Sequence, residues 1–404
     1  MSHRSSSRLR RAVPLLIVTA ALAGVRPTAA AAQTLELVFH PADSIFLYEV
    51  EPSQGLWSAV VQNVAIINRG AEPVELASLT IEAVTPDGSS TARTVPASYL
   101  AQSAARLHGL EAAGLLDLYD FHFQTSRLLS GDARIASSAT VAPGEGLIVS
   151  GQPILVGAPR GRLTVSVAGR SERGGAVTGS AEIPIAVATP EIVVRSPVRG
   201  VWYVAAAPTF DAHHRWAAPQ EFAFDLVVLG EDAEMSAGDG LRSTDYHAYG
   251  RTVHAVAAGV VVDAESDAIE DEGRYRQPGE TAEEWQGRTI AAQNELLAEG
   301  PRTVSGNFVV IRHADGTYSN YIHLREGSVQ VAIGDSVSAG QVIGEVGQTG
   351  NSDAPHLHFQ VVDGPDPLYS RGLPVRFSDV EVVGFGWRDR YLRTGWFFKT
   401  DDDS

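Results

Sequence analysis

The histidines of "SDAPHLHFQV", residues 352–361, are the first residues whose type and spacing indicate chemistry. Successive side chains of a β-strand point to opposite faces, so His356 and His358 would lie side by side on one face. Leu357 and Phe359 would point the other way, into a core. Two imidazoles anchored in this way suit metal binding or proton transfer. A solvated strand face that carries two histidines would have the same pattern.

Strand-like runs surround this pair throughout the second half of the chain. Eight of the twelve histidines lie between residues 213 and 358, so histidine chemistry is expected in this half. The composition changes near "ATPEIVVRSPVRG", and we place a domain boundary between residues 192 and 193. The runs that predict a mainly β domain over residues 193–404 are "EFAFDLVVL", "TVHAVAAGVVVDA", "GNFVVIRHADG", "TYSNYIHL" and "QVIGEVG".

Three motifs in this half occur in an order known from one family. They are "YIHL" at 321–324, "GDSVSAGQVIG" at 334–344 and "GNSDAPHLHF" at 350–359. Together they resemble the lysostaphin-type zinc metallopeptidases that cut peptidoglycan. The resemblance covers about residues 197–380 and implies an antiparallel β-sheet fold. It does not extend to the amino-terminal half.

The resemblance implies a role for each motif histidine. His358 corresponds to a zinc ligand, His356 to the general base, and His323 to the group that stabilises the developing oxyanion. A zinc ion in a hydrolase usually has three protein ligands and a water molecule in the fourth position. A neutral imidazole near its ordinary pKa suits base catalysis at pH 7.

The remaining ligands come, in that family, from a His-x-x-x-Asp motif, and here the sequence departs from the pattern. The nearest match is "EFAFD", which supplies Asp225 as a ligand but places Glu221 where the family has histidine. Residues four apart in a straight strand are about 13 Å apart, so Glu221 could reach the metal of Asp225 only through a bend. His213 and His214 of "DAHHRW" are the alternatives, and we favour His214.

Three other histidines in this half are expected to have ordinary roles. His247 and His254 would lie at the surface or at the rim of the site, and His313 would end a strand.

A long insertion, about residues 263–305, separates two strands of this domain. It begins with an acidic run and continues into "TAEEWQGRTIAAQNELLAEGP". Thr281 and Glu284 have the spacing of a capping box, and Gly300-Pro301 would stop the helix that follows. The insertion could be a solvated excursion, which is the plainer interpretation, or a lid over the groove.

The amino-terminal half predicts a β-sandwich-like domain over residues 33–192. Strand-like runs such as "SAVVQNVAII" and "GRLTVSVAG" alternate with turn residues at the spacing of a sandwich. The alanine- and leucine-rich stretch at 98–121 interrupts them and predicts a helix. His40, His108 and His122 are scattered here and are expected to be surface or packing residues.

The beginning of the chain has the pattern of a cleavable signal peptide over residues 1–32. Arg4, Arg8, Arg10 and Arg11 precede an apolar run at 12–25, which is short for a membrane span, and small residues follow at 30–32. We therefore expect export to the periplasm, the cell envelope or the medium, with no stable membrane insertion after cleavage.

Composition excludes several classes of site and partner. The 404 residues carry a formal net charge of −17, which argues against nucleic acid and anionic membrane surfaces as partners. The chain has no cysteine, so thiolate metal sites, cysteine nucleophiles and redox motifs are absent. Any metal site must be built from His, Asp and Glu.

These observations favour an exported, zinc-dependent metalloendopeptidase that hydrolyses peptide bonds of peptidoglycan. The predicted zinc ligands are His214, Asp225 and His358, and the predicted catalytic residues are His356 and His323. The alternative is a catalytically inactive relative that activates other cell-wall hydrolases, because the first histidine of the family motif is replaced.

Overall fold

The strands of the first half alternate buried and exposed positions, as a sheet packed on one core requires. In β4, for example, Val74 and Leu76 are buried while Glu75 is exposed. The ten strands that the described residues contain here are β1 (Leu35–His40), β2 (Ile45–Glu51), β3 (Leu56–Asn68), β4 (Val74–Val84), β5 (Ser90–Pro96), β6 (Arg134–Ile135), β7 (Thr140–Val141), β8 (Glu145–Val156), β9 (Arg162–Ser171) and β10 (Ala176–Val187).

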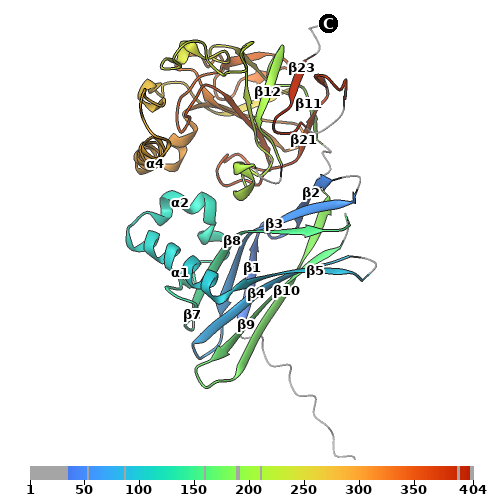
Figure 1. Cartoon of the computed structure of the whole chain (residues 1–404), viewed down its shortest axis with the longest axis vertical. Coiled ribbons are helices and arrows are strands. Elements are labelled where there is room, and N and C mark those ends of the chain that lie inside the picture. The colour runs from blue at the N-terminus through green and yellow to red at the C-terminus, as the bar shows by residue number, and fades with distance from the viewer. Residues whose placement is uncertain are drawn as a thin grey trace, which may run out of the picture. The chain divides into compact units, whose positions relative to one another are not determined.

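The computed structural model describes residues 35–51, 54–85, 88–158, 161–187, 192–209, 212–388 and 392–400. The predicted signal peptide, residues 1–32, lies outside these ranges. Residues 33–404 form one compact unit by their contacts. Within the described ranges, β1–β10 pair among themselves and β11–β23 pair among themselves. We refer to these two groups as the amino-terminal and carboxyl-terminal domains (Figure 1).

The amino-terminal strands follow the order β5-β4-β9-β10-β2-β3-β8-β6, in which β10 pairs with β2 in parallel. The β10–β2 pairing divides this order into two parts, β5-β4-β9-β10 and β2-β3-β8-β6. Both parts contribute to one apolar core, which includes residues of β3, β4, β8 and β9. The predicted helix at 98–121 is two helices, α1 (Ala97–Ala112) and α2 (Leu116–Phe123), followed by the single turn α3 (Thr125–Leu128). The break occurs at Gly114, whose positive φ of 70° ends α1.

The carboxyl-terminal domain is built on a nine-stranded sheet within the described residues, in the order β18-β15-β16-β17-β20-β13-β12-β23-β22. Its strands and their neighbours are β11 (Ile192–Val194), β12 (Val201–Ala206), β13 (Phe224–Val227), β14 (Thr252–His254), β15 (Gly259–Glu265), β16 (Asn307–Arg312), β17 (Tyr318–Leu324), β18 (Ser336–Val337), β19 (Val342–Glu345), β20 (Leu357–Val362), β21 (Val375–Phe377), β22 (Val380–Val382) and β23 (Phe397–Thr400). The prediction of a mainly β protein is confirmed.

The middle of this sheet positions the motif residues. Phe224 and Leu226 of β13, and Leu357 and Phe359 of β20, are at most 1% exposed and pack into one core. Asp225 and the pair of histidines are therefore turned to the opposite face. The predicted anchoring of the His-x-His pair by a buried leucine and phenylalanine is confirmed, although β20 begins one residue after His356.

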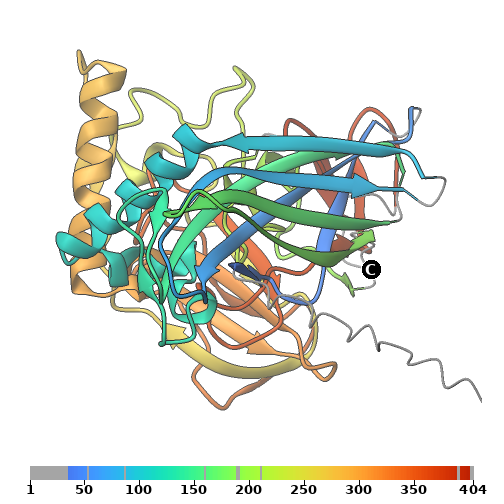
Figure 2. The ribbon, with the colours of Figure 1, turned by 90° about the horizontal axis from the view of Figure 1, so that it is seen from below.

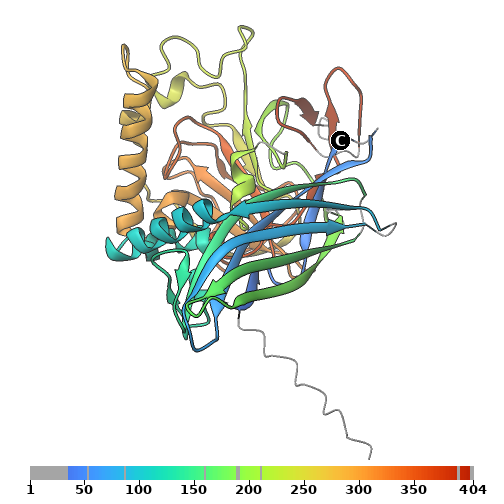
Figure 3. The ribbon, with the colours of Figure 1, turned by 60° about the horizontal axis from the view of Figure 1, so that its bottom comes forward.

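The insertion between β15 and β16 contains α4 (Ala282–Glu299), as the capping signals predict. Thr281 caps its amino end in a capping box with Glu284, and Gly300 follows its last residue. Figures 2 and 3 show α4, in orange, beside the helices of the amino-terminal domain. A hydrogen bond from Tyr119 of α2 to Asn294 of α4 connects them. Among the described helices, none is long and apolar enough to span a membrane.

Candidate metal site and catalytic centre

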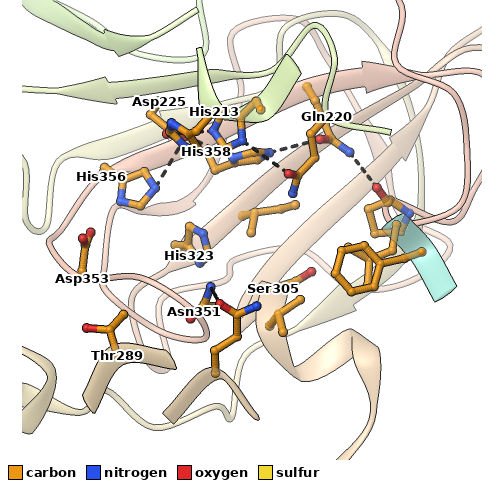
Figure 4. Close-up of a pocket in the computed structure, with 18 residues that line it drawn as sticks. His213, Gln220, Asp225, Thr289, Ser305, His323, Asn351, Asp353, His356 and His358 are labelled. Atoms are coloured by element: carbon orange, nitrogen blue, oxygen red, sulfur yellow. Dashed lines mark hydrogen bonds and ion pairs between the residues drawn. The ribbon is translucent and has the colours of Figure 1, made fainter. Parts of the chain in front are cut away.

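Two adjacent strands and one short turn bring the predicted site residues together. Asp225 of β13 pairs directly with His358 of β20, and His358 pairs on its other side with Ile322 of β17. The 3₁₀ turn His213–Trp216 precedes β13 and supplies two more histidines. Residues far apart in sequence thus share one face of the sheet (Figure 4).

The Asp225 carboxylate is the centre of this group. Its Oδ2 lies 2.8 Å from Nε2 of His214 and 3.4 Å from Nε2 of His213. Its Oδ1 lies 3.0 Å from Nδ1 of His358 and 3.6 Å from Nε2 of His356. Four imidazoles therefore converge on one buried carboxylate, an arrangement that a solvated polar strand face would not need.

Electrostatics keep this carboxylate ionised. Burial alone would raise the pKa of Asp225, but the imidazoles of His214 and His356 outweigh burial and hold that pKa well below its usual range. Burial lowers the pKa of His214 despite the opposing effect of Asp225. An ionised carboxylate beside a neutral imidazole is the protonation state in which both groups can bind a metal ion.

Two glutamines orient the imidazoles, and sequence reasoning missed both. Gln220 Oε1 lies 3.3 Å from Nδ1 of His214. Gln360 Oε1 lies 3.1 Å from Nε2 of His358, and its amide nitrogen donates to the carbonyl of Pro367 at 2.8 Å. That second bond fixes the amide so that His358 must carry its proton on Nε2 and turn the lone pair of Nδ1 toward Asp225. The available signal was position, because Gln360 follows His358 by two residues on one strand face.

His323 and His356 form a second pair beside this group, with their ring centroids 4.9 Å apart. Nδ1 of His323 lies 2.8 Å from the Thr349 carbonyl, and Nδ1 of His356 lies 2.8 Å from the Ala354 carbonyl. Each ring therefore donates Nδ1–H to the backbone and leaves Nε2 for other partners. Burial, followed by the neighbouring imidazoles, holds the pKa of His323 well below its ordinary value.

The backbone at His323 is itself unusual. Its φ is 65°, in the left-handed region that residues other than glycine rarely adopt. Such conformations persist where surrounding contacts enforce them and are concentrated at functional sites. Here the end of β17 directs the ring to the cavity while the next residue, Leu324, is fully buried.

All five predicted site residues line one cavity of about 370 Å³. Side chains from the insertion and from the amino-terminal domain line it as well. Thr289 and Gln293 of α4 and Phe121 of α2 complete its wall. The cavity is therefore bounded by elements from both domains.

The structure places the alternative ligand Glu221 away from this group. Glu221 is 2% exposed, and its environment includes Tyr48, Arg371 and Arg215. Burial raises the pKa of its carboxyl group to about 7, with partial compensation from these neighbours. The chain does bend between Glu221 and Asp225, but the bend turns Glu221 toward the amino-terminal domain.

The other histidines of this domain have local partners. His254 was expected at the surface or rim, and this is wrong: it is 9% exposed and bonded to the Gly340 carbonyl, because β14 packs against β19. His313 follows β16 and contacts the Ala258 carbonyl through Nδ1 and Ser319 through Nε2. His247 is partly exposed.

The donor set fits a zinc ion. One ligand atom from each of His213, His214 and Asp225 lies within 4.8 Å of the others, and His358 contacts the same carboxylate. Nitrogen and carboxylate oxygen donors without thiolates match the usual ligands of catalytic zinc.

Comparison with known proteins adds independent information on the site residues that lie between residues 323 and 358. The family model described as Peptidase family M23 matches residues 286–369. The chain carries a peptidase family M23 domain. The match includes His323, His356 and His358, whereas His214 and Asp225 lie outside it. The assignment of the first two ligands therefore depends on geometry.

Named relatives of this M23 domain match short segments. Over 78 residues the chain is 41% identical to the DD-carboxypeptidase/endopeptidase Mpg of Neisseria meningitidis, which covers 19% of this chain and 17% of that protein. Over 56 residues it is 50% identical to the glycyl-glycine endopeptidase ALE-1 of Staphylococcus capitis, or 14% of this chain and 15% of that protein. The chain thus spans less than a fifth of the length of these relatives.

Among solved structures, the catalytic domain of lysostaphin from Staphylococcus simulans aligns over 34% of this chain and 82% of that one. The identity is 23% and the TM-score is 0.20. The likeness is too low to support an argument about function.

Proposed function

We propose that this protein is an exported, zinc-dependent endopeptidase that hydrolyses peptide bonds of peptidoglycan. The observation that carries the proposal is the Asp225 carboxylate surrounded by imidazoles in a cavity of the M23 domain. Relatives whose names describe peptidoglycan or glycyl-glycine endopeptidases support the substrate class. The basic and apolar beginning of the chain supports export.

In this proposal His214, Asp225 and His358 hold the zinc ion. His214 is preferred to its neighbour because its side chain is 10% exposed and oriented by Gln220, whereas that of His213 is 70% exposed. A bound zinc ion would activate water and polarise the scissile carbonyl. The imidazole nitrogens of the site already converge on the Asp225 carboxylate. A non-catalytic activator would have no need for this arrangement.

The two other histidines handle protons. His356 accepts a proton on Nε2, because Nδ1 is bonded to the Ala354 carbonyl and Nε2 faces the carboxylate of Asp225. His323 Nε2 faces the cavity and donates to the oxygen that gains negative charge. Burial opposes protonation of His323, whereas a developing negative charge favours it. The proton that Nε2 donates is therefore taken from solvent as that charge develops and is returned to solvent when the charge is lost.

Metal analysis and a cleavage assay on residues 33–404 test the proposal together. We expect about one zinc ion per chain and release of soluble muropeptides from purified peptidoglycan, with both lost on chelation and restored by zinc. Asp225→Asn should lose both properties. His108→Ala, at an exposed surface position, serves as the control. Wild-type protein that stays zinc-free and leaves peptidoglycan intact would exclude the peptidase and favour the activator.

A further inference from the structure

The 3₁₀ turn His213–Trp216 carries two side chains that point to different parts of the molecule. His214 faces the cavity and Asp225, whereas the adjacent Arg215 is fully buried with 0% exposure. Burying a guanidinium is costly unless the charge is well compensated. The surroundings of Arg215 therefore indicate what the turn is attached to.

Arg215 is attached to the amino-terminal domain. Its Nη2 donates to Ser58 Oγ at 2.8 Å, and its guanidinium carbon lies 4.3 Å from the centre of the Tyr48 ring. Gln62 Nε2 donates to the backbone carbonyl of Arg215 at 2.8 Å. Ser58 and Gln62 are four residues apart on β3, so their side chains share one face of that strand.

The segment after the turn is attached to the same domain. Tyr48 donates to the backbone carbonyl of Glu221 at 3.0 Å. Phe222 stacks on the Tyr48 ring at 5.1 Å and meets the Phe46 ring edge-on at 5.3 Å. Both ends of the stretch that leads from His214 to β13 are thus fixed by β2 and β3.

The turn has little to stabilise it locally. Its backbone bonds join Arg215 to Ala212 and Ala217 to His214, which is one short 3₁₀ turn. Such turns have poor hydrogen-bond geometry and depend on their surroundings. The position of the His214 ring relative to Asp225 is consequently set by the amino-terminal domain as well as by the M23 sheet.

We propose that Arg215, with Ser58 and Gln62 as its hydrogen-bond partners, is the positioning group for the first metal ligand, His214. The amino-terminal domain is then a working part of the metal site and not an independent module. This inference depends on the proposed function, in which His214 binds zinc.

Zinc competition titrations on residues 33–404 test this assignment. Arg215→Met should lower zinc affinity about 10–100-fold, the usual cost of losing a group that orients a ligand. Gln62→Leu and Ser58→Ala should lower it in the same direction. Tyr119→Phe is the control, because Tyr119 of α2 also bridges the domains, through its hydrogen bond to Asn294 of α4, without touching the turn or the segment that leads to β13.

A double-mutant cycle separates positioning from general destabilisation. If Arg215 acts through His214, adding Arg215→Met to His214→Ala should cost far less affinity than Arg215→Met alone. The visible absorption of the cobalt-substituted protein should change in Arg215→Met and stay as in wild type in Tyr119→Phe, since it reports ligand geometry. If Arg215→Met does not fold, Gln62→Leu replaces it in the cycle.

The outcomes are distinct. If the wild-type protein binds zinc but the variants of Arg215, Ser58 and Gln62 keep its affinity, the positioning role is overturned while the proposed function stays intact. Strictly additive losses in the double-mutant cycle would overturn the positioning role as well. Wild-type protein that binds no zinc would overturn the proposed function itself.

Discussion

Among the described acidic residues of its domain, Asp225 has imidazoles on both carboxylate oxygens. Each of the imidazoles of His214, His358, His356 and His323 is in turn bonded to a fixed acceptor: an amide oxygen for the first two, and a backbone carbonyl for the last two. The protonation pattern of the whole group follows from these acceptors. The rings of His214 and His358 face the carboxylate closely, whereas the rings of His356 and His323 remain available for proton transfer.

At this scale we predict that His356→Ala keeps zinc and loses hydrolysis. His356 lies 3.6 Å from the carboxylate and is not needed to complete a three-ligand set. Loss of a positioned base should reduce turnover by a factor of about 100 or more. Zinc content and initial rates on muropeptides, measured on the same preparation, provide the check.

His313→Ala is a suitable comparison, because this histidine directly follows β16 of the same sheet and contacts the Ala258 carbonyl instead of the cavity. Near-normal turnover by the His356 variant, or loss of its zinc, would show that the role has been assigned to the wrong histidine.

Among the elements, α4 lines the cavity from the side of the insertion, through Thr289 and Gln293. Its capped ends were predictable from Thr281 and Gly300, but its location over the cavity was not, because that location arises from contacts with distant segments. Gln293 Oε1 accepts a bond from Asn351 at 3.4 Å, and Thr289 faces the same cavity. These contacts favour the lid over the solvated excursion.

Replacing residues 281–300 by a short Gly/Ser link should raise hydrolysis of soluble muropeptides, because it removes one wall of the cavity. The replacement leaves Glu270 in place, which accepts a hydrogen bond from the backbone N–H of Gln348 at 3.1 Å. Glu283→Ala, on the exposed side of α4, should leave the rate unchanged. Rates that match wild type in a folded deletion variant would mean that the insertion only decorates the surface.

The same contrast between local and distant contacts explains how far the sequence could predict this site. The strand pattern around His356 and His358 is local, and so is the apolar setting of Asp225, so both were predictable. The choice among His213, His214 and Glu221 was not, because it depends on distant partners such as Tyr48, which lies 173 residues from Glu221 in the sequence. No periodicity in the turn itself encodes that contact.

For the molecule as a whole, Glu221 gives the contact between the domains a pH dependence. Its pKa is raised from 4.5 to about 7 by burial, so the folded chain retains a proton that the unfolded chain has already released over this range. The resulting stabilisation is fully present below the ordinary pKa and is lost as the pH rises from there through 7. A shift of this size corresponds to a contribution on the order of 3 kcal/mol.

Glu221→Gln should therefore stabilise the protein at about pH 8.5 relative to wild type and change it little near pH 4.5, where the wild-type carboxyl group is protonated in the folded chain. Thermal unfolding of both proteins across this range measures the difference. Glu326→Gln, at an exposed position, is expected to follow wild type throughout. A wild-type stability curve that keeps the same offset from the curve of the Glu221→Gln variant at every pH would show that this carboxyl group does not titrate in the window.

The parallel pairing of β11 with β21 has a consequence for synthesis. Ile192 lies opposite Val375, and among the described strands β11 pairs with β21, so this pairing forms only after residues 375–377 have left the ribosome. Ser58 and Gln62 belong to a sheet whose strands are all complete by residue 187, and domains generally fold in the order in which they are made. The segment that carries His214 would then emerge beside a surface already shaped to receive it. In this order of events the amino-terminal domain, which is synthesised first, guides the folding of the segment that carries His214.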